Sequence, residues 1–302
     1  MHITNMKKFF ELVVVIPIGP TCNAEYITDT VDSILHYTTA SLKIIFADDS
    51  QKQTGDLLKS IYTNADVVST AKSMGKLCGL YINLSQAFQH ALQHYSFAAL
   101  LRMDTDALII GDDPVREAVQ LFKQHPDIGI AGQYPLDYNG NEWDKGWPRF
   151  QLSRFTHILK MWKRPLVNFQ LRKHYKRAVK HGYIMGESVF GGACFYSNKC
   201  LAAMNDAGLL KKEIFKTLDL EEDHLFAILA KSVGMNFGDL SSGNKPFACA
   251  WKNLPASPEQ LYETHKKIIH SVRGYNNIKE PEIRRYFRQR RKLNSFLTTQ
   301  YL

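Results

Sequence analysis

The sequence predicts an α/β fold with a doubly wound, mostly parallel sheet. Apolar runs rich in β-branched residues alternate with helical patterns through the first half of the chain. Runs that are apolar at every position are typical of strands buried on both faces, and the helical stretches between them are long enough for right-handed crossovers. The length of 302 residues, 45% of them apolar, suits one large α/β domain or two small ones.

Each element follows from its local pattern. Residues 12–18 form the first predicted strand, in which 13–16 are all β-branched; residues 42–47 form the second, and the Val-Val pair within 65–70 marks a short third. The apolar run 97–103 and the run 128–132 complete the predicted strands. Helices are expected between them at about 26–37, 55–62, 76–94 and 114–124.

Polar groups follow three of these strands at the point where each strand ends. They are Gly19-Pro20-Thr21, Asp48-Asp49 and Asp104-Thr105-Asp106. Ligands of such sheets bind outside the carboxyl ends of the strands. We therefore expect one crevice to hold all three groups.

Composition and charge narrow the class of protein. The fractions of apolar, charged and aromatic residues are ordinary for a globular chain, which excludes collagen, coiled coils, intrinsic disorder and small disulfide scaffolds. The net charge of +9 favours anionic partners without choosing among them. Five scattered cysteines without a C-x-x-C pair indicate reduced, intracellular thiols, and no run of apolar residues is long enough to span a bilayer. We expect a cytoplasmic protein, with a signal peptide at the start as the less favoured interpretation.

A basic segment at residues 145–186 stands apart from the rest. It holds eleven Lys or Arg residues and no Asp or Glu. The aromatic residues interleaved with them are Trp147, Phe150, Phe155, Trp162, Phe169, Tyr175 and Tyr183. One interpretation is a solvated basic helix pair; the other is a surface that meets an anionic acceptor or membrane head groups, at the inner face of the membrane. A second basic run at 284–292 could serve the same surface.

Asp104 and Asp106 are the central candidates for chemistry. Two carboxylates that follow an apolar strand need partners, and a divalent cation shared with a diphosphate is a natural one, since Mg²⁺ and Mn²⁺ accept carboxylate and phosphate oxygens. We expect the pair at a strand end, outside the core. Asp48-Asp49 could accept hydrogen bonds from a base or a ribose, or serve as a cap or Asx turn. Lys76 could meet a phosphate at a helix start, with a solvated lysine as the default interpretation.

Further candidates lie in the second half of the chain. Gly191-Gly192 in an apolar run suggests a close approach of backbone to a ligand, or a bulge. Glu221, Glu222 and Asp223 precede an amphipathic helix and offer a general base. His270 is a candidate metal ligand, although a single histidine is more often structural or solvated. The patterns H-E-x-x-H, G-x-S-x-G and G-x-x-x-x-G-K-[ST] are absent, which removes the simplest zinc protease, serine hydrolase and P-loop interpretations.

Taken in order, six blocks of this chain resemble the GT-A glycosyltransferases, most closely the family 2-like group. The blocks are VVVIPIGPTCNAEYITDTVDSIL, KIIFADDS, GKLCGLYINLSQAF, LLRMDTDALII, VFGGACFYS and DLEEDHLFAIL. They cover about residues 12–245. The resemblance implies a GT-A, Rossmann-like sheet flanked by helices, a divalent metal (Mn²⁺ or Mg²⁺) and a nucleotide-sugar donor, with a UDP-sugar as the default.

The resemblance also assigns roles to individual residues. Pro17, Ile18, Asp48 and Asp49 would line the base and ribose site, Lys76 would lie near the phosphates, and Thr105 would contact the donor. Asp104 and Asp106 match the D-x-D pair that holds the metal, with His270 as a third ligand. Gly191-Gly192 matches an acceptor-side segment, and in Glu222-Asp223 the Asp would be the base of an inverting displacement.

The same resemblance divides the chain. A catalytic domain at 1–245 would comprise a nucleotide-sugar-binding half at 12–135, the basic insertion at 145–186 and an acceptor and catalytic half at 187–245. Residues 246–302 would be a C-terminal extension that packs on the active site and ends in a basic, helical tail. The acceptor would be a glycan, a lipid-linked sugar or another hydroxyl compound.

Two departures from the family pattern and two rival functions accompany this interpretation. Cys78-Gly79-Leu80-Tyr81 stands where the family often has an Arg- or Asn-rich stretch, and the Q-x-x-R-W block of processive synthases is absent, which favours transfer of a single sugar. A sugar nucleotidyltransferase is the first rival, although GPTCNAEY lacks its Gly-rich, basic loop. The second is a non-enzymatic protein that binds nucleic acid or an anionic membrane; it leaves both carboxylate clusters unexplained, and nucleic acid is the less expected partner.

Overall fold

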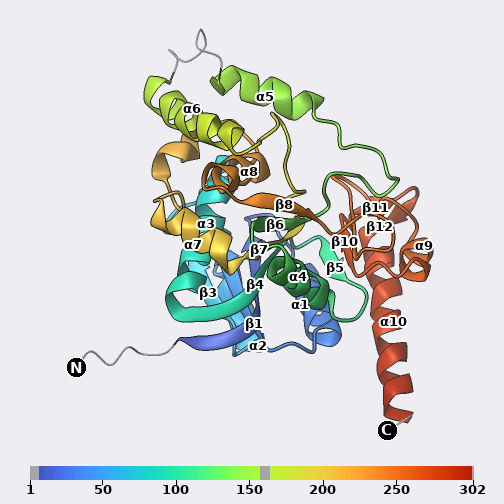
Figure 1. Ribbon diagram of the computed structural model, residues 1–302. Helices are drawn as coiled ribbons and strands as arrows, with labels where there is room; N and C mark the ends of the chain where they lie inside the picture. Colours follow the sequence, from blue (N-terminus) through green and yellow to red (C-terminus); the bar gives the residue numbers. More distant parts are fainter. Residues whose placement is uncertain (1–6, 157–163, 301–302) are drawn as a thin grey trace.

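The computed structural model describes residues 7–156 and 164–300 and confirms the mixed α/β fold (Figure 1). In this part of the chain, seven strands form a central sheet in the order β3-β2-β1-β4-β7-β6-β8. They are β1 (Lys8–Ile18), β2 (Leu42–Asp48), β3 (Asp66–Ser69), β4 (Tyr95–Met103), β6 (Ile128–Gly132), β7 (Ala193–Ser197) and β8 (Asn236–Asp239). Only β7 runs against its neighbours β4 and β6, so the sheet is mostly parallel, as predicted.

Helices cover both faces of this sheet. They are α1 (Ala24–Tyr37), α2 (Thr54–Ile61), α3 (Cys78–His94), α4 (Pro114–Gln124), α7 (Asn198–Asp206), the 3-10 helix η2 (Glu213–Thr217) and α8 (Glu222–Ser232). Alternate residues of β1 face two separate cores. Val13 and Val15 join the core of α3, α7 and α8, whereas Val14 and Ile16 join the core of α1 and α4. Burial on both faces explains why β1 is apolar at every position from Leu12 to Ile18.

The elements predicted for residues 12–132 are all present, with small shifts of their ends. β1 starts at Lys8, and α3 starts at Cys78 after the loop that holds Lys76. Asn23 caps α1 because its side chain accepts a hydrogen bond from the backbone N–H of Glu25 at 2.9 Å. A short strand, β5 (Ala107–Ile109), was not among the predicted ones.

A second, small sheet joins the C-terminal part of the chain to the loop region after β4. Its strands are β5, β9 (Phe247–Cys249) and β10 (Ile268–His270), in the order β5-β10-β9. β10 pairs with β5 antiparallel, so that His270 lies opposite Ala107. The remaining C-terminal elements are α9 (Pro258–Glu263), β11 (Gly274–Tyr275), β12 (Ile278–Lys279) and α10 (Glu280–Gln300), at the right of Figure 1.

Three arginines of the second basic run, at 284–292, are engaged inside the protein, so only part of the run is left to serve a ligand surface. In α10, Arg284, Arg288 and Arg291 all pair with Asp29 of α1, whose side chain is almost fully buried. Arg284 also donates to the backbone carbonyl of Thr105 at 2.8 Å. A buried carboxylate needs partners of opposite charge, so these arginines fix α10 to α1 and to the loop after β4.

The basic insertion forms two helices, α5 (Gly146–Thr156) and α6 (Pro165–Lys180), of which α6 packs on α8. Residues 157–163 lie outside the described residues, and with them Trp162 of the basic, aromatic segment. The five cysteines are free thiols. Among the described helices, none combines the length and apolar character needed to cross a membrane.

Candidate active site

The fold gathers Asp104, Asp106 and His270 into one group. Each side chain offers one ligand atom, and these atoms lie within 4.8 Å of one another. The two aspartates stand between β4 and β5, and the pairing of β5 with β10 places His270 beside them. Nε2 of His270 is 3.2 Å from Oδ1 of Asp106. The site therefore combines the two aspartates that follow β4 with a histidine of β10, far apart in the sequence.

Asp106 is buried, with 6% of its surface exposed, so the expectation that it lies outside the core is wrong. Ser271 donates to Oδ2 at 2.7 Å, and Nε of Arg273 lies 2.8 Å from the same oxygen. Although burial opposes the shift, the hydrogen bonds from His270 and Ser271 hold the pKa of Asp106 well below its usual range. The carboxylate is charged and oriented at neutral pH.

The donor set of this group fits a divalent cation. The other ring nitrogen of His270, Nδ1, lies 2.9 Å from the carbonyl of Ala250. A hydrogen bond from Nδ1–H to a backbone carbonyl is the usual way in which a protein orients a histidine whose Nε2 ligates a metal. Two carboxylates and one imidazole are donor groups that could hold a divalent metal ion.

Arg102 of β4 joins the aspartates to the second carboxylate cluster. Its guanidinium Nη2 lies 2.9 Å from Asp104 Oδ1 and 2.8 Å from Glu222 Oε1, and the side chain is 1% exposed. Burial raises the pKa of Asp104, and burial raises the pKa of Glu222 to about 7, in both cases against the opposing charge of Arg102. One buried cation thus holds the D-x-D loop and the start of α8 in a fixed relation.

Glu222 and Asp223 occupy the first turn of α8, but only one of them faces Arg102. Glu222 is 8% exposed. The side chain of Asp223 is 22% exposed, and its Oδ1 accepts a hydrogen bond from the backbone N–H of His224 at 2.7 Å. Both acids suit a helix N-terminus because the free N–H groups there carry partial positive charge. Because Glu222 is buried against Arg102 and Asp223 is partly exposed, Asp223 is the carboxylate of the pair that can still meet a ligand.

Gly191 and Gly192 lie between these groups. A Cβ on Gly191 would come within 2.6 Å of Arg102 Nη1 and 3.0 Å of the Asp223 Cβ. A Cβ on Gly192 would come within 2.6 Å of three atoms of the His270 ring. The backbone approach that the sequence suggested is an approach to site side chains, and it also brings the Gly192 carbonyl 2.8 Å from the Asp104 N–H.

The residues expected around the base and ribose lie at the ends of β1 and β2. Pro17 and Ile18 are buried, and the Ile18 carbonyl accepts from the Asp49 N–H at 2.8 Å. Asp48 accepts from the N–H groups of Ser50 and Gly55, at 2.8 and 2.7 Å. The carboxylate of Asp48 therefore fixes the entry to α2.

Asp49 instead holds the loop that leads to α3. It accepts hydrogen bonds from Thr70, Ser73 and the Met74 N–H. Lys76 lies two residues beyond Met74 and is exposed. Asp49 thus positions the segment that carries Lys76. No sequence pattern indicated this role of Asp49.

Thr105 is tied to two other segments. Its backbone carbonyl accepts from Thr30 at 3.0 Å and from Arg284 at 2.8 Å, and its hydroxyl lies 3.6 Å from Cys22 Sγ. These bonds hold the middle residue of the D-x-D loop.

Sequence reasoning missed Arg102 and the partners Ser271 and Arg273. An arginine inside the apolar run 97–103 was a usable signal, because a charge on a buried strand requires a partner. Ser271 and Arg273 gave no comparable signal, since they reach Asp106 only through the pairing of β10 with β5.

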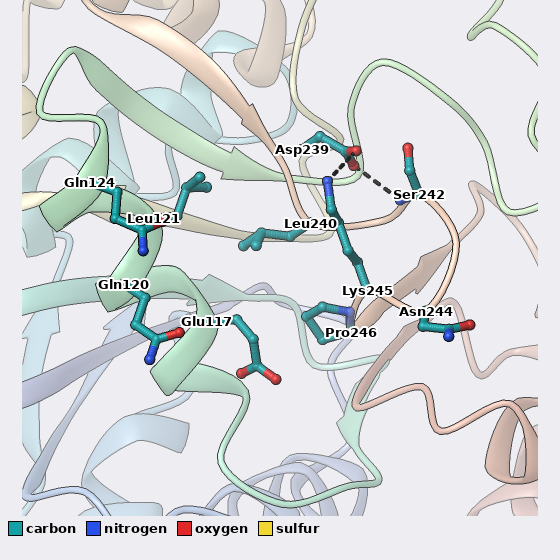
Figure 2. Close-up of a pocket in the computed structure, with 10 residues that line it drawn as sticks. All are labelled: Glu117, Gln120, Leu121, Gln124, Asp239, Leu240, Ser242, Asn244, Lys245 and Pro246. Atoms are coloured by element: carbon teal, nitrogen blue, oxygen red, sulfur yellow. Dashed lines mark hydrogen bonds and ion pairs between the residues drawn. The ribbon is translucent and has the colours of Figure 1, made fainter.

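A cavity lies elsewhere, between α4 and the segment that joins β8 to β9 (Figure 2). Glu117, Gln120, Asp239 and Lys245 are among the residues that line it, and Lys245 pairs with Asp239 at 2.7 Å. None of the candidate site residues lines this cavity.

Comparison with known proteins gives one family match. The family model described as Glycosyl transferase family 2 matches residues 14–190, which is more than half of the chain. No curated protein matches.

Several solved structures are similar over most of the chain at low sequence identity. S. aureus TarS 1–349 is 18% identical with a TM-score of 0.45, covering 84% of this chain and 63% of that one. A glycosyltransferase involved in the glycosylation of the major capsid of PBCV-1 is 10% identical with a TM-score of 0.46, covering 92% and 98%. Mouse xyloside xylosyltransferase 1 in its apo form is 10% identical with a TM-score of 0.41, covering 87% and 97%. The chain thus spans 63% of the length of TarS 1–349.

Proposed function

Because this chain belongs to glycosyl transferase family 2, we propose that it moves a single sugar from a nucleotide-diphosphate sugar to an acceptor hydroxyl. The observation that carries the proposal is the group of Asp104, Asp106 and His270, whose ligand atoms lie within 4.8 Å of one another. These three residues would hold Mn²⁺ or Mg²⁺. When bound, the metal supplies charge neutralisation for the departing diphosphate. A UDP-sugar is the default donor.

Asp223 is the proposed general base of a direct displacement. Its carboxylate takes the proton of the acceptor hydroxyl, the acceptor oxygen bonds to the anomeric carbon, and the bond from that carbon to the diphosphate oxygen breaks, with its electron pair leaving on the diphosphate. The configuration at the anomeric carbon inverts. Glu222 stays bound to Arg102 at 2.8 Å and so holds the start of α8 beside the aspartates.

The donor is proposed to lie along the strand ends. Pro17, Ile18, Asp48 and Asp49 would form the wall of the base and ribose site, and Lys76 would approach the phosphates from the loop held by Asp49. Thr105 would contact the donor from the D-x-D loop, and Gly191-Gly192 would border the acceptor. The acceptor class is a glycan, a lipid-linked sugar or another hydroxyl compound, and the reaction is proposed to occur in the reducing cytoplasm, in keeping with the free thiols.

Thermal unfolding with a panel of nucleoside diphosphates, each with and without Mn²⁺, tests the proposal. A ligand at 100 times its Kd adds about 2.7 kcal/mol of stability, which is a shift of several degrees for a domain of this size. We expect one diphosphate to stabilise the wild type only with metal, and Asp106→Asn to lose that effect. Stabilisation by no diphosphate, or equal stabilisation of the variant, would contradict the proposed donor site.

A further inference from the structure

The two helices of the basic insertion show the same pattern on one face. In α5 it is Trp147, Phe150 and Arg154, and in α6 it is Leu166, Phe169 and Lys173. In both helices two apolar residues and one basic residue follow at positions i, i+3 and i+7, which places them on one side of the helix. The two helices pack on each other, and we call their exposed stripes, these six residues with Lys176 and Lys180, the α5–α6 face.

The apolar residues of this face are strongly exposed. Trp147 is 62% exposed, Phe150 55%, Leu166 74% and Phe169 60%. The rings of Trp147 and Phe150 stack with their centroids 5.7 Å apart. Large apolar side chains gathered on a surface are typical of interaction sites. These helices pack on the core of the protein through other residues, such as the buried Leu152 and Leu171, so the exposed apolar residues are not needed for that packing.

The charge of the face is entirely positive. Lys173, Lys176 and Lys180 follow one another on the exposed side of α6, and among the described residues none of the three takes part in an ion pair. Within the described ranges, the ion pair of Arg154 is with Asp219 at 3.9 Å, and both side chains are more than half exposed, so that contact is weak. Residues 145–186 contain no acid that could neutralise the face from within.

We propose that the α5–α6 face docks on an anionic lipid bilayer. Aromatic and aliphatic side chains enter the boundary between head groups and acyl chains, while lysines beside them meet the anionic head groups. A second copy of this chain fits less well, because a symmetric interface would set the same lysines against each other.

The position of the face relates it to the candidate active site. α6 packs on α8, and α8 begins with the carboxylates Glu222 and Asp223. Figure 1 shows α5 and α6 at the top, beyond α8 as seen from the central sheet. Docking through this face would hold the chain at a membrane that carries the acceptor, so the inference extends the proposed function by naming the surface on which the acceptor is met.

Vesicle co-sedimentation without any donor tests the proposal. Vesicles of phosphatidylcholine alone and of phosphatidylcholine with phosphatidylglycerol are compared, with wild type, Phe150→Ser/Phe169→Ser and Lys173→Gln/Lys176→Gln/Lys180→Gln. Leu57→Ser/Ile61→Ser is the matched control, because both residues are 56% exposed on α2. Unchanged melting temperatures in solution establish that each variant is folded.

We expect the wild type to prefer the anionic vesicles and to release them as salt is raised, because salt screens exposed charges. Each basic residue at an anionic surface strengthens binding about fivefold, so loss of three lysines should weaken it on the order of 100-fold. The phenylalanine variant should also bind more weakly, and the α2 control should bind as the wild type does.

Equal binding to both kinds of vesicle, no binding at low salt, or an equal loss in the α2 control would overturn the proposal. A dimer in solution that only the phenylalanine variant disrupts, without vesicle binding, would assign the face to a second copy instead. Since no donor is present, none of these outcomes bears on glycosyl transfer, which the diphosphate experiment tests separately.

Discussion

Gly192 lies so close to His270 that any side chain at position 192 would collide with the imidazole. A Cβ there would come within 2.6 Å of Cδ2, Cε1 and Nε2 of the ring. The ring is held on its other side by the Ala250 carbonyl at Nδ1, 2.9 Å away. The glycine thus sets the position of the nitrogen that faces the two aspartates.

Gly192→Ala should therefore displace the ring and weaken metal binding. Loss of a group that orients a metal-ligating histidine typically costs 10–100-fold in affinity, and we expect a loss of that size for Mn²⁺, measured by calorimetry. His270→Ala and the double variant Gly192→Ala/His270→Ala complete a double-mutant cycle. The double variant should bind metal no worse than His270→Ala alone, because both changes act on the same ligand; additive losses would assign Gly192 a separate role.

Arg102→Met should destabilise the protein strongly. The change leaves Asp104 and Glu222 without the buried cation that contacts both at 2.9 and 2.8 Å. Removal of one partner of a buried ion pair costs about 3–5 kcal/mol, which urea unfolding followed by circular dichroism would measure. Arg102→Lys keeps the charge and should lose less. A methionine variant as stable as the wild type would show that the bridge contributes nothing to folding.

Asp223→Asn should reduce kcat far more than it changes the KM for the donor. A general base contributes typically 10²–10⁴-fold to the rate, and the amide cannot accept the proton. Steady-state kinetics with a sugar-nucleotide donor would measure both constants. Asp219→Asn is the matched control, since the side chain of Asp219 is 62% exposed and, among the described residues, its ion pair is with Arg154. This variant should retain nearly full activity. Equal losses in kcat and donor affinity for Asp223→Asn would point to a structural role.

Stability should fall as the pH drops from about 6.5 towards 4 because of His174. Burial and the ammonium of Lys212, 3.4 Å from its Nε2, lower the pKa of His174 to about 4. The unfolded chain binds a proton on this residue near pH 6.5, whereas the folded chain does so only near pH 4, so protons favour unfolding between these values.

The melting temperature of wild type and His174→Gln between pH 7.5 and 4.5 measures this effect. The variant should lose less stability on acidification than the wild type. His94→Gln, which changes an exposed histidine, should follow the wild-type curve. Parallel curves for wild type and His174→Gln would remove His174 as a source of the pH dependence.

Five strands of the central sheet, β1, β2, β3, β4 and β6, could be predicted because each is encoded locally, whereas β7 and β8 were not among the predicted strands. Runs such as 12–18 are apolar at every position since the strand faces two cores, and the polar groups that follow β2 and β4 mark where these strands end. Asp104 and Asp106 could be singled out for the same reason, as two charges directly after a buried strand.

What the tertiary structure decided is how the distant residues meet. His270 reaches Asp106 only because β10 pairs with β5, and Arg102 is recognised as a bridge only when α8 brings Glu222 to it. In the basic run of α10, Arg284, Arg288 and Arg291 form ion pairs with Asp29 of α1, which no local pattern indicated. Local patterns record whether a residue is buried, whereas the partner of a buried charge is set by strand pairing and helix packing between segments far apart in the chain.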